Sequence, residues 1–131
     1  TLMGKEDFLV KIKCDPSIQL NADEQLLREA FINLLDNAIK YGDPDQGISI
    51  TVEMNSSLII QFQNHGEPIP AKYKDRIFHR FYRIDKSRSR RQGGTGLGLA
   101  IVKHIIFVHG GDISVTSDKV SGTKFLIELP L

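Results

Sequence analysis

A glycine-rich segment stands directly before an apolar stretch in the last third of the chain. It is Gly-Gly-Thr-Gly-Leu-Gly-Leu over residues 93–99. Glycines let a backbone pass close to a phosphate chain, and the free N–H groups of a helix start favour anions. The spacing fits neither a P-loop, which needs Lys-Ser or Lys-Thr at its end, nor a dinucleotide fingerprint. The segment therefore predicts a phosphate-binding turn or, equally, a flexible hinge.

A second group of polar residues has helical spacing. Asn33, Asn37, Lys40 and Tyr41 stand at i, i+4, i+7 and i+8. They share one stripe, beside the apolar face of a helix expected from about residue 23 to 41. Amide oxygens can ligate Mg²⁺, lysine can meet a phosphate, and tyrosine can stack on a base. The alternative is a solvated helix flank.

The third group is basic and aromatic. Residues 76–83 are Arg-Ile-Phe-His-Arg-Phe-Tyr-Arg, and only Asp85 opposes five basic residues between Arg83 and Arg91. A run of this kind is commonly a solvated charged surface. Because it leads into the glycine-rich segment, it also fits a lid over a polyphosphate.

The elements that must position these residues alternate in type. Paired strands separated by helices predict the α+β class, as a two-layer α/β sandwich. Its mixed, mostly antiparallel sheet would be covered on one face by about three helices. We expect strands over 8–13, 48–52, 58–62, 113–115 and 125–129, helices over 23–41, 72–78 and 97–109, and a loop over 83–96.

Bulk composition excludes several classes of function. A chain of 131 residues fits one domain, and its net charge of +1 provides no field to recruit nucleic acid or an anionic membrane. The single cysteine, Cys14, rules out an internal disulfide and a Cys-rich metal site. No apolar run reaches the roughly 18 residues that span a bilayer. We therefore expect no nucleic-acid partner and no direct membrane contact by this domain.

In this order, the segments resemble the catalytic ATP-binding domain of sensor histidine kinases, which has the Bergerat fold shared with gyrase, Hsp90 and MutL. Residues 31–41 resemble its N box, 64–70 its G1 box, 76–83 its F box and 94–99 its G2 box. The match continues through Gly122-Thr123 near the end. Residues 1–131 would then be a single catalytic domain, with the acceptor-histidine and sensor domains elsewhere in the parent protein.

The resemblance implies a role for each matching residue. Asn37 would ligate Mg²⁺, Asn33 lies one turn before it, and Arg83 would approach the γ-phosphate, so Asn33 and Arg83 are the catalytic candidates. Lys40 would lie near the phosphates, Tyr41 would pack on adenine, and Asn64 would meet the adenine amino group. Phe78 and Phe81 would anchor the ATP lid. The remaining residues expected to contact ATP are Gly66, Ile69, Gly94, Thr95, Gly96, Leu97, Gly98 and Leu99.

The implied reaction passes the γ-phosphoryl group of Mg-ATP to a histidine on the parent's dimerisation domain, in a homodimer that then serves a response regulator. None of the four histidines here has the sequence context of an acceptor. The isolated domain should therefore not autophosphorylate. The parent would sit in the bacterial cell membrane with this domain in the cytoplasm.

One box departs from the family pattern. Its usual form is Asp-x-Gly-x-Gly-Ile, whereas this chain has Asn64-His-Gly-Glu-Pro68-Ile-Pro. Asn64 keeps a carbonyl oxygen but loses charge assistance, a difference on the order of 1 kcal/mol. Pro68 fixes φ and removes a donor. We therefore predict weakened ATP affinity.

Other readings of the altered box stay open. The variant resembles that of VanS-type glycopeptide-resistance sensor kinases, which would connect the parent to antibiotic resistance. A pseudokinase of the same fold, with little or no ATP binding, is the main alternative. An anti-sigma serine kinase is disfavoured by the F box. A gyrase- or MutL-like ATPase is disfavoured because those chains carry Glu where Asn33 stands.

Overall fold

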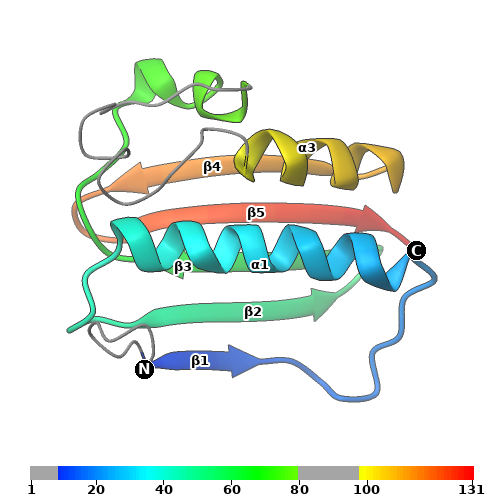
Figure 1. Ribbon diagram of the computed structural model, residues 1–131. Coiled ribbons are helices and arrows are strands. Elements are labelled where there is room, and N and C mark those ends of the chain that lie inside the picture. Colours follow the sequence, from blue (N-terminus) through cyan, green and yellow to red (C-terminus); the bar gives the residue numbers. More distant parts are fainter. Residues whose placement is uncertain (1–8, 80–97) are drawn as a thin grey trace.

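The computed structural model describes residues 9–79 and 98–131. Within these residues, helices α1 and α3 lie over the same face of a five-stranded sheet (Figure 1). The elements in chain order are β1 (Val10–Lys13), α1 (Glu24–Tyr41), β2 (Ile48–Met54), β3 (Ser57–Asn64), the 3-10 helices η1 (Ala71–Tyr73) and η2 (Arg76–Phe78), α3 (Gly98–Val108), β4 (Asp112–Asp118) and β5 (Gly122–Pro130).

The sheet has the strand order β1-β2-β3-β5-β4. Only β1 runs parallel to its neighbour, and the other three pairings are antiparallel. The end of β3, the start of β5 and the end of β4 lie side by side at one end of the sheet, because Asn64 pairs with Thr123 and Asp118 pairs with Gly122. The predicted two-layer sandwich with a mixed, mostly antiparallel sheet is confirmed.

Helix α1 begins at a side-chain cap and ends at a glycine, close to the range of 23–41 that was predicted for it. The Asp23 carboxylate accepts a hydrogen bond from the Leu26 N–H, which satisfies one of the unpaired donors of the first turn. Gly42 follows the helix in an extended conformation. Its inward face carries the apolar spacing of an amphipathic helix. The buried residues are Leu27, Ala30, Leu34 and Ala38.

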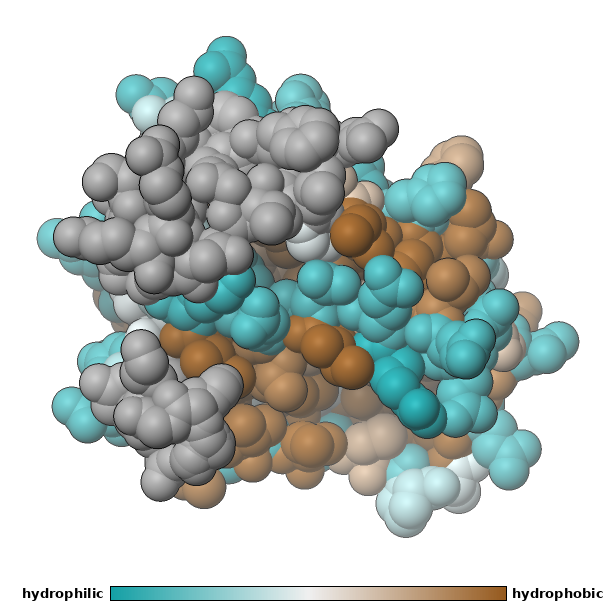
Figure 2. Space-filling view, in the orientation of Figure 1, coloured by the Kyte–Doolittle hydropathy of each residue, from teal (hydrophilic) through white to brown (hydrophobic). Residues whose placement is uncertain are grey.

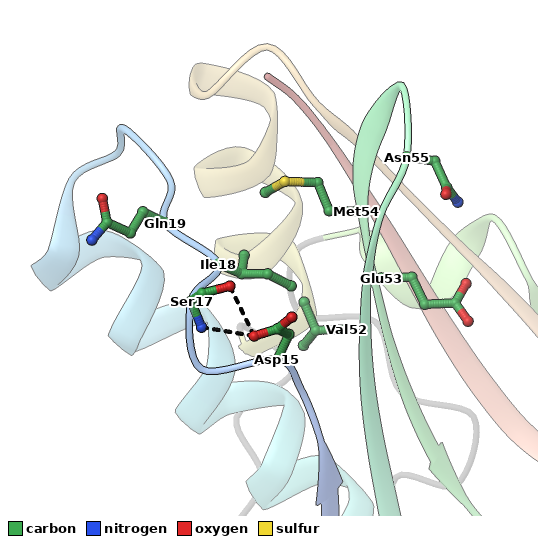
Figure 3. A pocket seen from close by; sticks show the side chains of 8 residues that line it. All are labelled: Asp15, Ser17, Ile18, Gln19, Val52, Glu53, Met54 and Asn55. Atoms are coloured by element: carbon green, nitrogen blue, oxygen red, sulfur yellow. Dashed lines mark hydrogen bonds between the residues drawn. The ribbon is translucent and has the colours of Figure 1, made fainter.

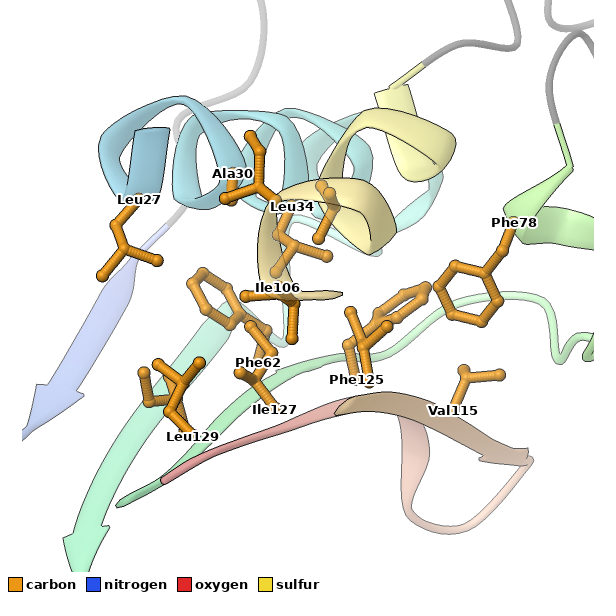
Figure 4. Close-up of a cluster of buried hydrophobic side chains, with 14 of the residues drawn as sticks. Leu27, Ala30, Leu34, Phe62, Phe78, Ile106, Val115, Phe125, Ile127 and Leu129 are labelled. Atoms are coloured by element: carbon orange, nitrogen blue, oxygen red, sulfur yellow. The ribbon is translucent and has the colours of Figure 1, made fainter. Parts of the chain in front are cut away.

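The core lies between the two helices and the sheet (Figure 4). Alternate residues of the central strands point into it, including Phe62 of β3 and Phe125 of β5. Ile106 of α3 is fully buried against them. Hydrophilic side chains run along the exposed side of α1, across the middle of the face seen in Figure 2. Burial of these apolar rows holds the helices on the sheet.

The prediction of one continuous helix over 72–78 is wrong. Two separate 3-10 helices occupy that segment, and neither has a side-chain cap at its first turn. Ile77 and Phe78 of the second one are buried. Single turns anchored by two apolar side chains replace the continuous helix, since short 3-10 pieces commonly serve as connectors.

A histidine joins α1 to α3 at the end of the helix pair that is remote from Gly42. The His109 Nε2 accepts the Asp23 N–H at 3.1 Å, so the neutral ring carries its proton on Nδ1, 2.8 Å from the Ile105 carbonyl oxygen. Both ring nitrogens are therefore used.

No helix in the described residues has the length and hydropathy needed to cross a membrane.

Replacing His109 with Ala should lower the free energy of unfolding by about 1 kcal/mol, because the hydrogen bond to Asp23 of the other helix and the one to the Ile105 carbonyl oxygen are lost. Chemical denaturation measures the change. His104→Ala is the matched control, since His104 is an exposed residue of the same helix. Equal losses in the two variants would show that the histidine bridge contributes nothing.

Candidate functional site

The predicted stripe on α1 lies between the buried and the exposed faces of the helix. Asn33, Asn37, Lys40 and Tyr41 are all half-buried. The Lys40 ammonium forms an ion pair with Asp36 at 3.2 Å, one turn earlier. The stripe is thus placed to meet a ligand at the rim of the core rather than to fill the core.

Asn33 contacts the beginning of α3. Its Nδ2 donates to the Glu29 carbonyl oxygen of its own helix at 2.9 Å, which fixes the carboxamide. A Cβ atom added at Gly98 would lie 3.1 Å from the Asn33 Oδ1. The absence of a side chain at Gly98 therefore lets α3 start directly against the N-box helix, at the point where the glycine-rich segment ends.

The end of α1 touches the segment that follows β3. Gly42 and Gly66 form an isolated antiparallel bridge, and the Asp43 N–H donates to the His65 carbonyl oxygen. Any side chain at Gly66 would collide with the Tyr41 carbonyl oxygen. The glycine of the predicted G1 box is thus required for this approach. It brings the box beside Tyr41 at one end of the sheet.

Three polar side chains form a row across that end of the sheet. Asn64, Thr123 and Ser117 are paired in register on β3, β5 and β4. Asn64 and Thr123 are each only 5% exposed. The hydroxyls of Ser117 and Thr123 are 2.7 Å apart, and the Ser117 Oγ also accepts the Ile69 N–H at 2.8 Å. The row ties the G1 segment to the sheet.

Ser117 and Thr123 were missed by sequence reasoning as site residues. The strand pattern offered a signal for them. Each lies two residues from a buried apolar residue, Val115 or Phe125, and therefore on the same inward face of its strand. A polar residue at such a position must find a hydrogen-bond partner. Only the strand order shows that both lie beside Asn64.

The structure places the remaining predicted residues in two groups. Phe78 is buried, with its ring edge-on to Phe125 at a centroid distance of 6.0 Å. Leu99 is partly buried and packs against the core. The predictions for Phe81, Arg83, Gly94, Thr95, Gly96 and Leu97 fall outside the described residues.

A separate cavity of about 790 Å³ opens at the opposite end of the sheet (Figure 3). It lies between the loop before α1 and the tip of the β2–β3 hairpin, and Ile18, Val52 and Met54 supply its apolar lining. Hydrogen bonds from the Ser17 N–H and hydroxyl lower the pKa of the Asp15 carboxyl at its rim. This cavity contains no residue of the predicted site.

The candidate metal ligand in the described part of the site is an amide oxygen rather than a cluster of carboxylates, histidines or cysteines. Across residues 9–79 and 98–131, no group of three or more His, Cys, Asp or Glu side chains could hold a metal ion. The carboxamide of Asn37 makes no hydrogen bond within that part of the chain. An amide oxygen at the rim of the site suits a hard cation that completes its shell with water and phosphate.

Comparison with known proteins decides the family. The model of the histidine kinase-, DNA gyrase B- and HSP90-like ATPases matches residues 22–131. The chain belongs to this ATPase family. The ATPase domain is 42% identical to the probable sensor kinase SilS of Salmonella typhimurium, over 94% of the chain and 24% of that protein. The sensor histidine kinase CusS of Escherichia coli K12 is also 42% identical, over 97% of the chain and 26% of its own length.

Solved structures agree with this assignment. The ATPase domain superimposes on the mycobacterial sensor histidine kinase MprB with a TM-score of 0.80 and 29% identity, over 92% of this chain and 80% of that one. The catalytic domain of the histidine kinase ThkA gives 0.77 and 32%, with the same coverages. The chain spans about a quarter of the curated relatives it matches. It corresponds to the ATP-binding catalytic domain of sensor histidine kinases, and the predicted Bergerat fold is confirmed.

Ser117→Ala should loosen the G1 segment of the ATPase domain. The Ile69 N–H loses its acceptor, so its hydrogen exchange should accelerate by about tenfold or more. Ser114→Ala is the matched control, because Ser114 lies on the exposed face of the same strand. If exchange at Ile69 were unchanged in the Ser117 variant, that hydrogen bond would not hold the segment in solution.

Proposed function

We propose that this domain transfers the γ-phosphoryl group of Mg-ATP to a histidine on a separate helical domain of its parent protein. The observation that carries the proposal is that the described parts of three predicted boxes lie next to one another. They are the N-box stripe of α1, the G1 segment beside Tyr41 and the start of α3 beside Asn33. Such convergence is what a nucleotide needs for its base, phosphates and metal to be bound together.

Asn37 is the proposed Mg²⁺ ligand. Its half-buried carboxamide has no hydrogen-bond partner in the described part of the chain, so its oxygen is available. When bound, Mg²⁺ supplies charge neutralisation at the β- and γ-phosphates. Asn33, proposed with Arg83 as a catalytic residue, lies one turn before Asn37, and its carboxamide is held by the Glu29 carbonyl oxygen.

Lys40 and Arg83 are the proposed cationic partners of the phosphates. Lys40 lies one turn from Asn37 on the same flank, and its ion pair with Asp36 is partly exposed. Exchange of that carboxylate for a phosphate oxygen would cost little, because exposed ion pairs are weak. Arg83, by its place after the F box, would stabilise charge on the γ-phosphate. Positioning and charge stabilisation are the main contributions a protein makes to phosphoryl transfer.

The acceptor histidine is proposed to lie outside this chain. Both His109 nitrogens are engaged at the α1–α3 junction, and His104 points outward from α3. The partners proposed for the parent are its own dimerisation domain, in a homodimer, and a response regulator. We also propose a membrane location for the parent, with this domain on the cytoplasmic side. A link to glycopeptide resistance through the altered G1 box stays a prediction.

Asn37→Ala should abolish Mg²⁺-dependent nucleotide binding. Titration of the domain with a fluorescent ATP analogue, with Mg²⁺ and with EDTA, measures the difference. Asn55→Ala is the control, because Asn55 is an exposed turn residue at the far end of the sheet. Full Mg²⁺ dependence in the Asn37 variant would overturn the ligand assignment.

Phosphoryl transfer should require the parent's helical domain. Mixing the two separately made domains with labelled ATP should give acid-labile phosphate on the helical domain and none on this one. Acid-stable phosphoserine would instead indicate a serine kinase. Absence of any nucleotide binding at millimolar concentration would support the pseudokinase alternative.

A further inference from the structure

We propose that the nucleotide site accepts 6-oxopurine triphosphates, such as inosine triphosphate, with an affinity comparable to that for ATP. The inference rests on the proposed function, and in particular on Asn64 as the residue facing the purine edge. It concerns which bases that residue can recognise. The decisive feature is that the polar row at this end of the sheet has no fixed hydrogen-bond polarity.

Asn64 is buried, but its side chain is not hydrogen-bonded within the described chain. Its side chain is 5% exposed, and its carboxamide makes no hydrogen bond to another residue of the described chain. Buried polar groups in folded proteins are almost always paired. No described side-chain nitrogen or oxygen is both fully enclosed and unpartnered, so the carboxamide reaches solvent. A largely buried amide whose polar atoms still reach solvent and have no partner is suited to hydrogen-bond with a ligand.

The neighbours of Asn64 in the row are ambivalent as well. Hydroxyls both donate and accept, and either of Ser117 and Thr123 can be the donor in the bond between them. The Ile69 N–H is a donor without that freedom, and it is already used by Ser117. The row can therefore rearrange its protons to suit a ligand.

Nearby carboxylates do not impose a polarity on the row. Asp43 follows α1, and its oxygens accept the Asp45 N–H and the Gln46 side-chain amide within one turn. Asp118 ends β4, and its Oδ1 accepts two backbone N–H groups of the turn before β5. Both are occupied within their own turns. The row itself consists of three neutral side chains, Asn64, Thr123 and Ser117.

The edges of adenine and of a 6-oxopurine have opposite patterns of hydrogen-bond donors and acceptors. Adenine presents an amino donor at C6 and an acceptor at N1, whereas a 6-oxopurine presents an acceptor at C6 and a donor at N1. A carboxamide matches either pattern, because rotation by about 180° about its soft terminal torsion exchanges oxygen and nitrogen. A carboxylate only accepts, so it would favour adenine and repel a 6-oxo group. A carboxylate that faces an acceptor instead of a donor loses roughly tenfold to a hundredfold in affinity, and Asn64 gives up that discrimination.

Competition binding to the intact 131-residue chain tests the proposal, with ATP and inosine triphosphate as the probes and Mg²⁺ present. These nucleotides differ only at positions 6 and 1 of the purine. We expect dissociation constants within about tenfold of each other. Asn64→Asp should raise the preference for ATP by about tenfold or more. Asn55→Asp, with the same charge change at an exposed turn, should leave the ratio unaltered.

Each outcome decides one question. If ATP binds but inosine triphosphate binds more than a hundredfold more weakly, the inference fails while the proposed function stands. An unchanged ratio in Asn64→Asp would also overturn it, because another group would then set base choice. If neither nucleotide binds, the proposed function fails with it. Should Asn64→Asp not fold, as judged by thermal denaturation, the ratio measured on the unaltered chain decides.

Discussion

A backbone contact between two glycines is the constraint on which the candidate site depends. Gly42 ends the helix that carries the N-box stripe, and Gly66 lies two residues after the last residue of β3. Because neither has a side chain, their backbones meet as an antiparallel bridge. That approach sets Tyr41 beside the G1 segment. With any larger residue at Gly66, the end of α1 and the segment after β3 would have to move apart.

The site grows out of the core without a break in its pattern. Along β3, β5 and β4 the inward positions are apolar in successive rows, and Phe62, Phe125 and Val115 form the last of these. The next row outward is Asn64, Thr123 and Ser117. The same alternation that buries apolar side chains thus places polar side chains on the inward face at the end of the strands. A rigid scaffold of this kind favours pre-organised binding.

Sequence reasoning found what local patterns determine. The range of the long helix was predicted closely because capping and helix termination are local, and the alternation in the strands determined which side chains face inward. The split of the 72–78 segment was not foreseeable from its apolar spacing. The polar row was missed for a different reason. Ser117 and Asn64 lie 53 residues apart and come together only through the strand order, which follows from tertiary packing.

The histidine bridge connects one end of α3 to α1 by a hydrogen bond, whereas the other end only contacts it. His109 fastens the helix terminus to Asp23, while Gly98 merely abuts Asn33 at the other end. With 11 residues, α3 is about 16 Å long. A tilt of about 5° about its fastened end would move the start of the helix by roughly 1.4 Å. Because the glycine-rich segment precedes that start directly in the chain, a force at Gly98 would act on α3 at its greatest distance from the hydrogen-bonded end.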